Sequence, residues 1–248
     1  MQKEFIPLVE DMVRLSEHYF RRRLVAIYLH GSVAMGDAVP YVSDLDSYLV
    51  LSKELGREDK RYLERTQEEL QQRYPAINGV HLSAHSANDL TGDPFARFVL
   101  RYNSILCYGN DIAGEIDNSG WERFEPNAEM AKGRLAFARK CFEQALDCEQ
   151  PMCTGEIPTD PCLASRKYAR YFVVIEGAYF LMSRNQFESF EKEDVLNKLY
   201  QYASAFKKEL DMTREILKDS KVAGIAQDEF LRRIRPLVEW MFDRIEET

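Results

Sequence analysis

The feature that most constrains this chain is a pair of apolar segments joined by a short polar connection. Residues 24–29 are apolar and lead into His30, Gly31 and Ser32, and residues 48–51 follow the acidic triplet Asp44-Leu45-Asp46. An apolar run that ends in Gly-Ser is typical of a buried strand that leads into a turn. Glycine adopts unusual backbone dihedral angles there and lets a ligand approach the main chain. We therefore predict strands over residues 24–30 and 45–51.

The spacing of the two acids carries chemical information. In a strand, residues two apart lie roughly 6.5 to 7 Å apart on one face, whereas in a helix they diverge. At that separation two carboxylates repel by about 2 to 3 kcal/mol at an effective dielectric constant of 20. The pair becomes favourable when a divalent cation lies between it and a polyphosphate, because Mg²⁺ prefers a few carboxylates plus phosphate oxygens. Asp44 and Asp46 thus predict a Mg²⁺ site, with Ser32 at the start of a short helix as a phosphate seat.

The longer string around these residues resembles a known family. Leu-His-Gly-Ser-Val-Ala-Met-Gly-Asp, followed by Ser-Asp-Leu-Asp, is similar to the signature of the polymerase-beta-like nucleotidyltransferase superfamily, above all to aminoglycoside (antibiotic) adenylyltransferases and their uncharacterised bacterial relatives. The resemblance implies transfer of AMP from ATP to a hydroxyl group, with Mg²⁺ bound by Asp44 and Asp46. It also implies nucleotide contacts from Gly31, Ser32 and Ser43, and a role in antibiotic resistance.

A purely structural interpretation of the same motif is also available. Gly31 would then be an ordinary turn residue and Asp44 a cap, but Asp46, at the head of an apolar strand, would have no role. His30, beside Gly31, is a further candidate contact to the nucleotide, or a residue that bonds to nearby backbone.

The third predicted strand lacks an expected acid. Residues 80–86 alternate, with apolar side chains on one face and His81, Ser83 and His85 on the other. In the adenylyltransferases that this chain resembles, this strand carries a third carboxylate, which binds metal or acts as general base. Histidine accepts a proton near pH 7, so His81 is the first candidate for the general base. The alternative is that His81 only fills a polar groove.

Other antibiotic nucleotidyltransferases take their base from the helical domain, which directs attention to Glu176. It is the only acid within residues 171–180, where a carboxylate is costly unless it is paired or faces a wet cleft. Its alternative role is a salt bridge with a neighbouring helix. Glu143 is a weaker candidate base. Lys167 resembles a basic residue that reaches the triphosphate, although a surface lysine is the more common case.

Composition limits the classes of partner. Thirty-three Lys and Arg residues against forty-one Asp and Glu residues give a net charge of −8, which argues against an extended nucleic-acid surface. The same charge favours a small cationic acceptor. No stretch is long and apolar enough for a membrane span and the first residues lack a signal-peptide core, so we expect a cytoplasmic protein whose five cysteines are reduced thiols.

Helical and turn patterns complete the expected architecture. Helices are predicted over residues 7–20, 58–74 and 94–102, and a short strand over 104–108, before a turn-rich linker near residues 114–126. The later pattern is helical, with segments at 127–148, 162–184, 191–202, 205–218 and 227–246. We therefore predict an α+β chain. Its catalytic domain, residues 1–124, has a small mixed sheet flanked by helices, and an all-α bundle, residues 125–248, binds the acceptor.

Two other functions fit the same fold. The missing third acid is consistent with a non-catalytic member that binds a nucleotide or other small ligand. The chain could also modify a protein or an RNA end, although the acidic charge argues against RNA.

Overall fold

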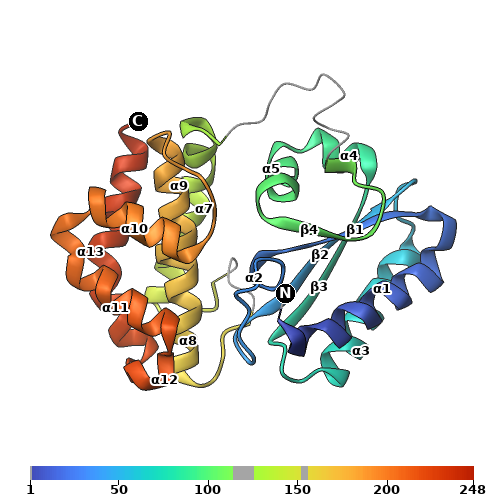
Figure 1. The fold of residues 1–248 in the computed structure, drawn as a ribbon, viewed down its shortest axis with the longest axis horizontal. Helices are drawn as coiled ribbons and strands as arrows, with labels where there is room; N and C mark the ends of the chain where they lie inside the picture. The colour runs from blue at the N-terminus through green and yellow to red at the C-terminus, as the bar shows by residue number, and fades with distance from the viewer. Residues whose placement is uncertain (1, 114–125, 152–155) are drawn as a thin grey trace. The chain divides into compact units, whose positions relative to one another are not determined.

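A computed structural model describes residues 2–113, 126–151 and 156–248. The chain divides into two compact units, Met1–Glu125 and Pro126–Thr248 (Figure 1). The predicted turn-rich linker, with Gly114 and the run 117–120, lies outside the described residues, as does Cys153.

The first unit is built on a four-stranded mixed sheet. Its strands are β1 (Leu24–His30), β2 (Asp44–Leu51), β3 (Gly79–Ser86) and β4 (Ser104–Gly109), in the order β3-β2-β1-β4. β1 pairs antiparallel with β2 and β4, and β2 pairs parallel with β3. The helical segments of this unit are η1 (Lys3–Phe5), α1 (Ile6–Phe20), η2 (Arg21–Arg23), α2 (Gly31–Ala34), α3 (Arg57–Arg73), α4 (Ala87–Gly92) and α5 (Pro94–Tyr102).

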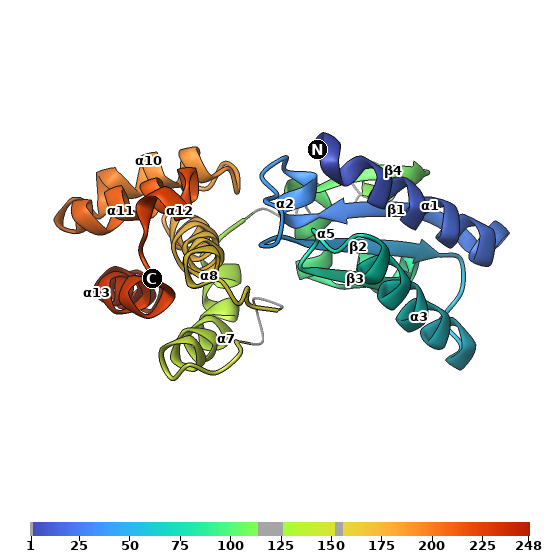
Figure 2. The same cartoon turned by 90° about the horizontal axis from the view of Figure 1, so that it is seen from below.

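The two faces of the sheet have different cores. On one face, Ile27, Leu29 and Leu49 join a large apolar cluster with residues of α1 and α3. On the other face, Ala26 and Val50 join a smaller cluster with residues of α4 and α5. Figures 1 and 2 show the two helix pairs on opposite sides of the strands. The strand period of two explains this division, because alternate side chains point to opposite faces.

Both edge strands are fixed by specific contacts. Along β3, the side-chain carbonyl of Gln67 in α3 accepts a hydrogen bond of 2.7 Å from the Leu82 N–H group. On β4, Gly109 has φ +82°, and a Cβ atom there would lie 2.0 Å from the carbonyl oxygen of Val25. Only glycine fits this position, so the Leu-Cys-Tyr-Gly segment can close the sheet against β1.

The second unit contains only helices among its described residues. They are α7 (Ala128–Leu146), α8 (Pro161–Tyr168), η3 (Ala169–Ile175), α9 (Glu176–Ser183), α10 (Lys192–Tyr202), η4 (Ser204–Phe206), α11 (Lys207–Lys218), α12 (Ser220–Ala223) and α13 (Gln227–Glu246). α8, η3 and α9 follow one another directly and form the central member of the bundle, because nearly every side chain from Tyr168 to Met182 is buried. The middle segment, η3, is a π-helix, which the sequence did not predict.

The predicted fold class is confirmed: a mixed sheet flanked by helices is followed by a helical region. Predicted strand and helix ends agree with the structure within about two residues, but α4, α12 and the short 3₁₀ segments were missed. Cysteines 107, 141, 148 and 162 are free thiols. None of the described helices is both long and apolar enough to cross a membrane.

Candidate active site

The two aspartates lie at the start of β2, on the face of the sheet opposite the large core. Asp44 and Asp46 alternate with the buried side chains of Leu45 and Ser47, so both acids are on one face and partly exposed. In the register of the sheet, Asp46 lies opposite His30 of β1 and beside His81 of β3. The strand therefore brings to one place the two acids and the histidine that the sequence singled out.

Asp46 lies directly against the Gly-Ser turn. Gly31 has φ +72°, a left-handed conformation that side-chain-bearing residues rarely adopt. A Cβ atom on Gly31 would lie 3.0 Å from Oδ2 of Asp46, closer than an ordinary contact. The glycine thus provides both the backbone turn and the space that the carboxylate occupies.

Asp44 has a similar arrangement with the start of β3. Its Oδ1 atom and the Nε2 atom of His81 each lie 3.1 Å from the position of a Cβ atom on Gly79. The side-chain amide of Asn78 donates a hydrogen bond of 3.3 Å to the same Oδ1 atom. His81 is exposed, as expected of a group that exchanges protons with a substrate. One acid and the candidate base are therefore neighbours across a residue without a side chain.

The predicted phosphate contacts differ in their surroundings. The Gly31 N–H group donates to the Asn103 carbonyl at 3.3 Å, which leaves the Ser32 N–H group and hydroxyl as the candidate phosphate donors of the turn. The Ser43 hydroxyl accepts a hydrogen bond of 2.9 Å from the Val39 N–H group, and Ser43 is only 9% exposed. The Ser43 hydroxyl therefore stabilises the loop before β2. A contact between Ser43 and a phosphate stays a prediction.

A row of rings continues from Asp46 across the same face. The rings of His30 and Tyr48 stack with centroids 4.6 Å apart, and His85 meets Tyr48 edge-on at 5.6 Å. Burial, and then the charge of His81, lower the pKa of His30 to about 4, so it is neutral at pH 7. Burial, with Asp93 and Asp46 nearby, raises the pKa of Tyr48 to about 12. Neither ring therefore titrates near neutral pH.

The helical unit gives Glu176 a partner. Its carboxylate, 1% exposed, accepts hydrogen bonds of 3.1 and 3.2 Å from the Nη2 and Nε atoms of Arg134 on α7. Arg134 also donates to the Tyr171 hydroxyl and lies over the Tyr179 ring at 4.7 Å. Burial raises the pKa of Glu176, whereas Arg134 opposes that rise. This geometry favours the salt-bridge interpretation of Glu176 over that of a general base.

Lys167 and Glu143, the other predicted residues of this unit, lie in different settings. The buried Lys167 donates through Nζ to the Glu156 carbonyl at 2.6 Å, and Glu143 is exposed on α7. A contact between Lys167 and a triphosphate stays a prediction.

The chemistry of the acids suits Mg²⁺. No cluster of three or more His, Cys, Asp and Glu side chains placed to hold a metal occurs in the part of the chain that the structure describes. Mg²⁺ commonly binds proteins through one or two carboxylates and completes its shell with substrate phosphates and water. Asp44 and Asp46, each set against a glycine that leaves room for its oxygen atoms, fit that requirement.

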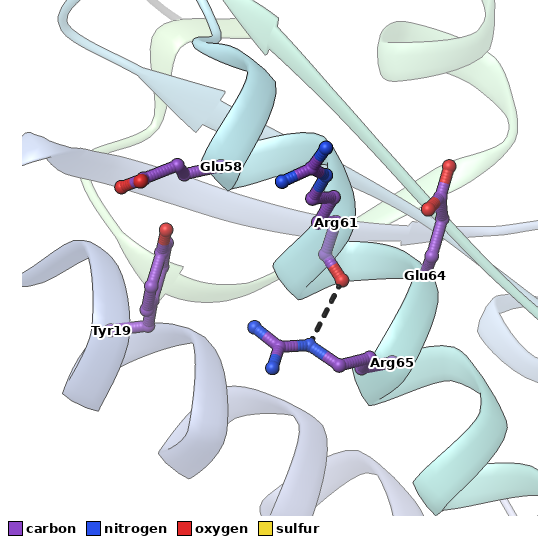
Figure 3. Close-up of a pocket in the computed structure, with 5 residues that line it drawn as sticks. All are labelled: Tyr19, Glu58, Arg61, Glu64 and Arg65. Carbon is purple, nitrogen blue, oxygen red and sulfur yellow. Dashed lines mark hydrogen bonds between the residues drawn. The ribbon is translucent and has the colours of Figure 1, made fainter.

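A pocket of about 550 Å³ lies elsewhere on the unit (Figure 3). The pocket is lined by Tyr19 of α1 and by residues 58, 61, 64 and 65 of α3. Figure 3 shows the Arg65 side chain donating a hydrogen bond to the Arg61 carbonyl. These helices cover the sheet face opposite Asp44 and Asp46. Its two glutamates balance its two arginines, so nothing in its charge favours a polyphosphate.

Comparison with known proteins identifies the fold. No protein-family model and no curated protein matches the sequence. The structure is similar to the solved spectinomycin adenyltransferase AAD(9) from Enterococcus faecialis with ATP and spectinomycin. The alignment covers 97% of this chain and 99% of that one, with a TM-score of 0.52 and 12% sequence identity. The chain has a nucleotidyltransferase fold.

The resemblance to aminoglycoside adenylyltransferases is thus confirmed for the nucleotidyltransferase fold. A more distant match, a toxin-antitoxin structure with AMP-PNP, covers 56% of this chain and 98% of that one, with a TM-score of 0.35 and 14% identity.

Two residues of the candidate active site were not singled out from the sequence. Tyr48 follows Asp46 by two positions, so the strand period places it on the same face. Asn78 is the other, and its signal was the Asn-Gly pair immediately before the third strand.

Proposed function

We propose that this protein is a Mg²⁺-dependent nucleotidyltransferase that moves AMP from ATP to a hydroxyl group of a small acceptor. The observation that carries the proposal is the position of Asp46 against the Gly31-Ser32 turn, with Asp44 on the same face of β2. Two acids beside a backbone turn form a place for a metal-bound triphosphate.

Each residue has a role in this proposal. Asp44 and Asp46 hold Mg²⁺, which when bound supplies positive charge to neutralise the phosphates. Gly31 lets the triphosphate approach the main chain, and Ser32 donates hydrogen bonds to it. The acceptor oxygen attacks the α-phosphorus of ATP, the bond to pyrophosphate breaks, and Nε2 of His81 takes the hydroxyl proton. Catalysis then rests mostly on placement and charge.

Two observations support a small cationic acceptor. The net charge of −8 attracts cations and repels polyanions such as RNA. The similar solved enzyme carries ATP and spectinomycin, which supports a nucleotide and a small molecule as the two substrates. A role in antibiotic resistance follows if that acceptor is an aminoglycoside.

The test is Asp46→Asn in a pyrophosphate-release assay with ATP, Mg²⁺ and a panel of aminoglycosides. The amide keeps the size of the side chain but removes the charge, so we expect a melting temperature within a few degrees of the parent and at least a 100-fold loss of turnover, the rough scale of losing one charge-stabilising group. Asp147→Asn, an exposed position at the end of α7, should turn over like the parent. Equal rates for the parent and Asp46→Asn would refute the assignment.

A second candidate is a non-catalytic nucleotide-binding protein of the same fold. It is favoured by the polar face of β3, where His81, Ser83 and His85 stand and no acid does, and by the ion pair of Glu176. Titration calorimetry with ATP and Mg²⁺, beside the release assay, separates the two. Binding without release for any acceptor identifies the non-catalytic protein, and release identifies the enzyme.

A further inference from the structure

We infer that Asn78 is a positioning residue that holds the Asp44 carboxylate in the orientation needed to bind the metal of the triphosphate. This inference rests on the proposed function. It concerns a residue that touches neither the metal nor the reacting atoms and acts only through Asp44.

The contact joins two segments that are distant in sequence. The Nδ2 atom of Asn78 lies 3.3 Å from Oδ1 of Asp44, thirty-four residues earlier in the chain. The same oxygen lies 3.1 Å from the position of a Cβ atom on Gly79, so a side chain at that residue would displace it. The Asn-Gly pair therefore supplies both a donor to the carboxylate and the space in which it lies.

Asn78 can orient Asp44 because its own backbone is fixed. Its N–H group donates to the Ser43 carbonyl at 2.9 Å, which continues the parallel pairing of β2 and β3 past Asp44. The preceding carbonyl, of Ile77, accepts a hydrogen bond of 2.7 Å from the Gln71 side chain on α3. One residue further back, the Tyr41 N–H group donates to the Ala76 carbonyl at 2.6 Å.

An amide is chemically suited to this task. Asn78 is neutral, so it restrains the carboxylate without cancelling the charge that the metal needs, as a lysine would. The bond is long for an N–H to oxygen contact, which makes its effect one of orientation more than of charge stabilisation. Groups that orient metal ligands in this way typically change metal affinity by about 10- to 100-fold when they are removed.

The experiment is a double-mutant cycle on ATP binding, measured by titration calorimetry with Mg²⁺ and again with EDTA. We expect Asn78→Ala to weaken Mg²⁺-dependent binding about tenfold in the parent and to leave binding in EDTA unchanged. In Asp44→Asn the same substitution should have no further effect, because Asn78 acts through that carboxylate. Asn110→Ala is the matched control and should bind like the parent. Asn110 is exposed and directly follows β4, near the first residues of β1.

The outcomes separate the inference from the proposed function. Parent protein without Mg²⁺-dependent ATP binding overturns both. Such binding in the parent, with Asn78→Ala equal to it or equally damaging in Asp44→Asn, overturns the role of Asn78 alone. If Asn78→Ala melts well below the control, Asn78→Ser replaces it. Serine suits a turn, but its hydroxyl lies one bond closer to the backbone than the amide nitrogen of asparagine, so the same loss is expected.

Discussion

The Asp46 carboxylate occupies the space beside Gly31 where a side chain would lie. The substitution Gly31→Ala therefore tests whether the turn and the carboxylate depend on each other. Alanine at φ +72° is strained by about 1 to 2 kcal/mol, and its methyl group would lie 3.0 Å from Oδ2 of Asp46. We expect the free energy of unfolding to fall by about that amount and Mg²⁺-dependent ATP binding to fall with it. Gly133→Ala in α7, where a Cβ atom meets nothing within 4 Å, should instead gain about 0.5 to 1 kcal/mol in urea unfolding. Equal effects of the two substitutions would contradict this account.

The partly buried His30 should make the free energy of unfolding depend on pH. Its pKa is lowered from 6.5 to about 4 in the folded protein, so the folded state favours the neutral ring. That stabilisation is complete above the unfolded pKa and is lost as the pH falls from about 6.5 through 4. Relative to His30→Gln, the parent should lose about 2 to 3 kcal/mol of unfolding free energy between pH 7 and pH 4 in urea titrations.

Gln72→Ala, which removes an exposed side chain without a titratable group on α3, is the control for this measurement. Its stability should follow the parent at every pH. If His30→Gln also runs parallel to the parent, the ring of His30 is not held neutral.

At the scale of elements, the buried ion pair joins α7 to α9. Glu176→Leu leaves the Arg134 guanidinium, itself 14% exposed, without its carboxylate. We expect a loss of about 3 to 5 kcal/mol in urea unfolding, largely recovered by combining Glu176→Leu with Arg134→Met, because removing both charges also removes the uncompensated one. The exposed ion pair between Arg233 and Glu229 on α13 is the control. Glu229→Ala should lower the free energy of unfolding by about 0.5 kcal/mol or less. A double variant no more stable than Glu176→Leu would contradict the account.

Local features of these elements could be predicted from the sequence, whereas contacts between distant segments could not. The strands and the two faces of β3 were predictable because alternation of period two is local, and the apolar Val80 and Leu82 do lie in the large core. The contact of Asn78 with Asp44 was not, because it spans thirty-four residues and depends on the register of a parallel pair. The partner of Glu176 was missed for a similar reason: Arg134 lies forty-two residues away on another helix.

For the whole molecule, the fold and the identity of the proposed acceptor depend on different kinds of information. Apolar periodicity and a few turn residues predict a mixed sheet followed by helices, and the structure has both. In the proposed function, the choice of acceptor depends on side chains spread over several helices, whose order in space no local pattern encodes. Charge is the whole-molecule property that bears on it, and at −8 it favours cations.

The most direct test of the central claim is the affinity for ATP, measured by calorimetry with Mg²⁺ and with EDTA, for the parent, Asp46→Asn and Asp147→Asn. If Asp46 and Asp44 hold a metal beside the Gly31-Ser32 turn, the parent and Asp147→Asn will bind ATP more tightly with Mg²⁺. Asp46→Asn will lose at least about tenfold of that affinity, while its binding in EDTA stays the same. Parent and Asp46→Asn proteins that bind ATP equally well in Mg²⁺ would contradict the claim.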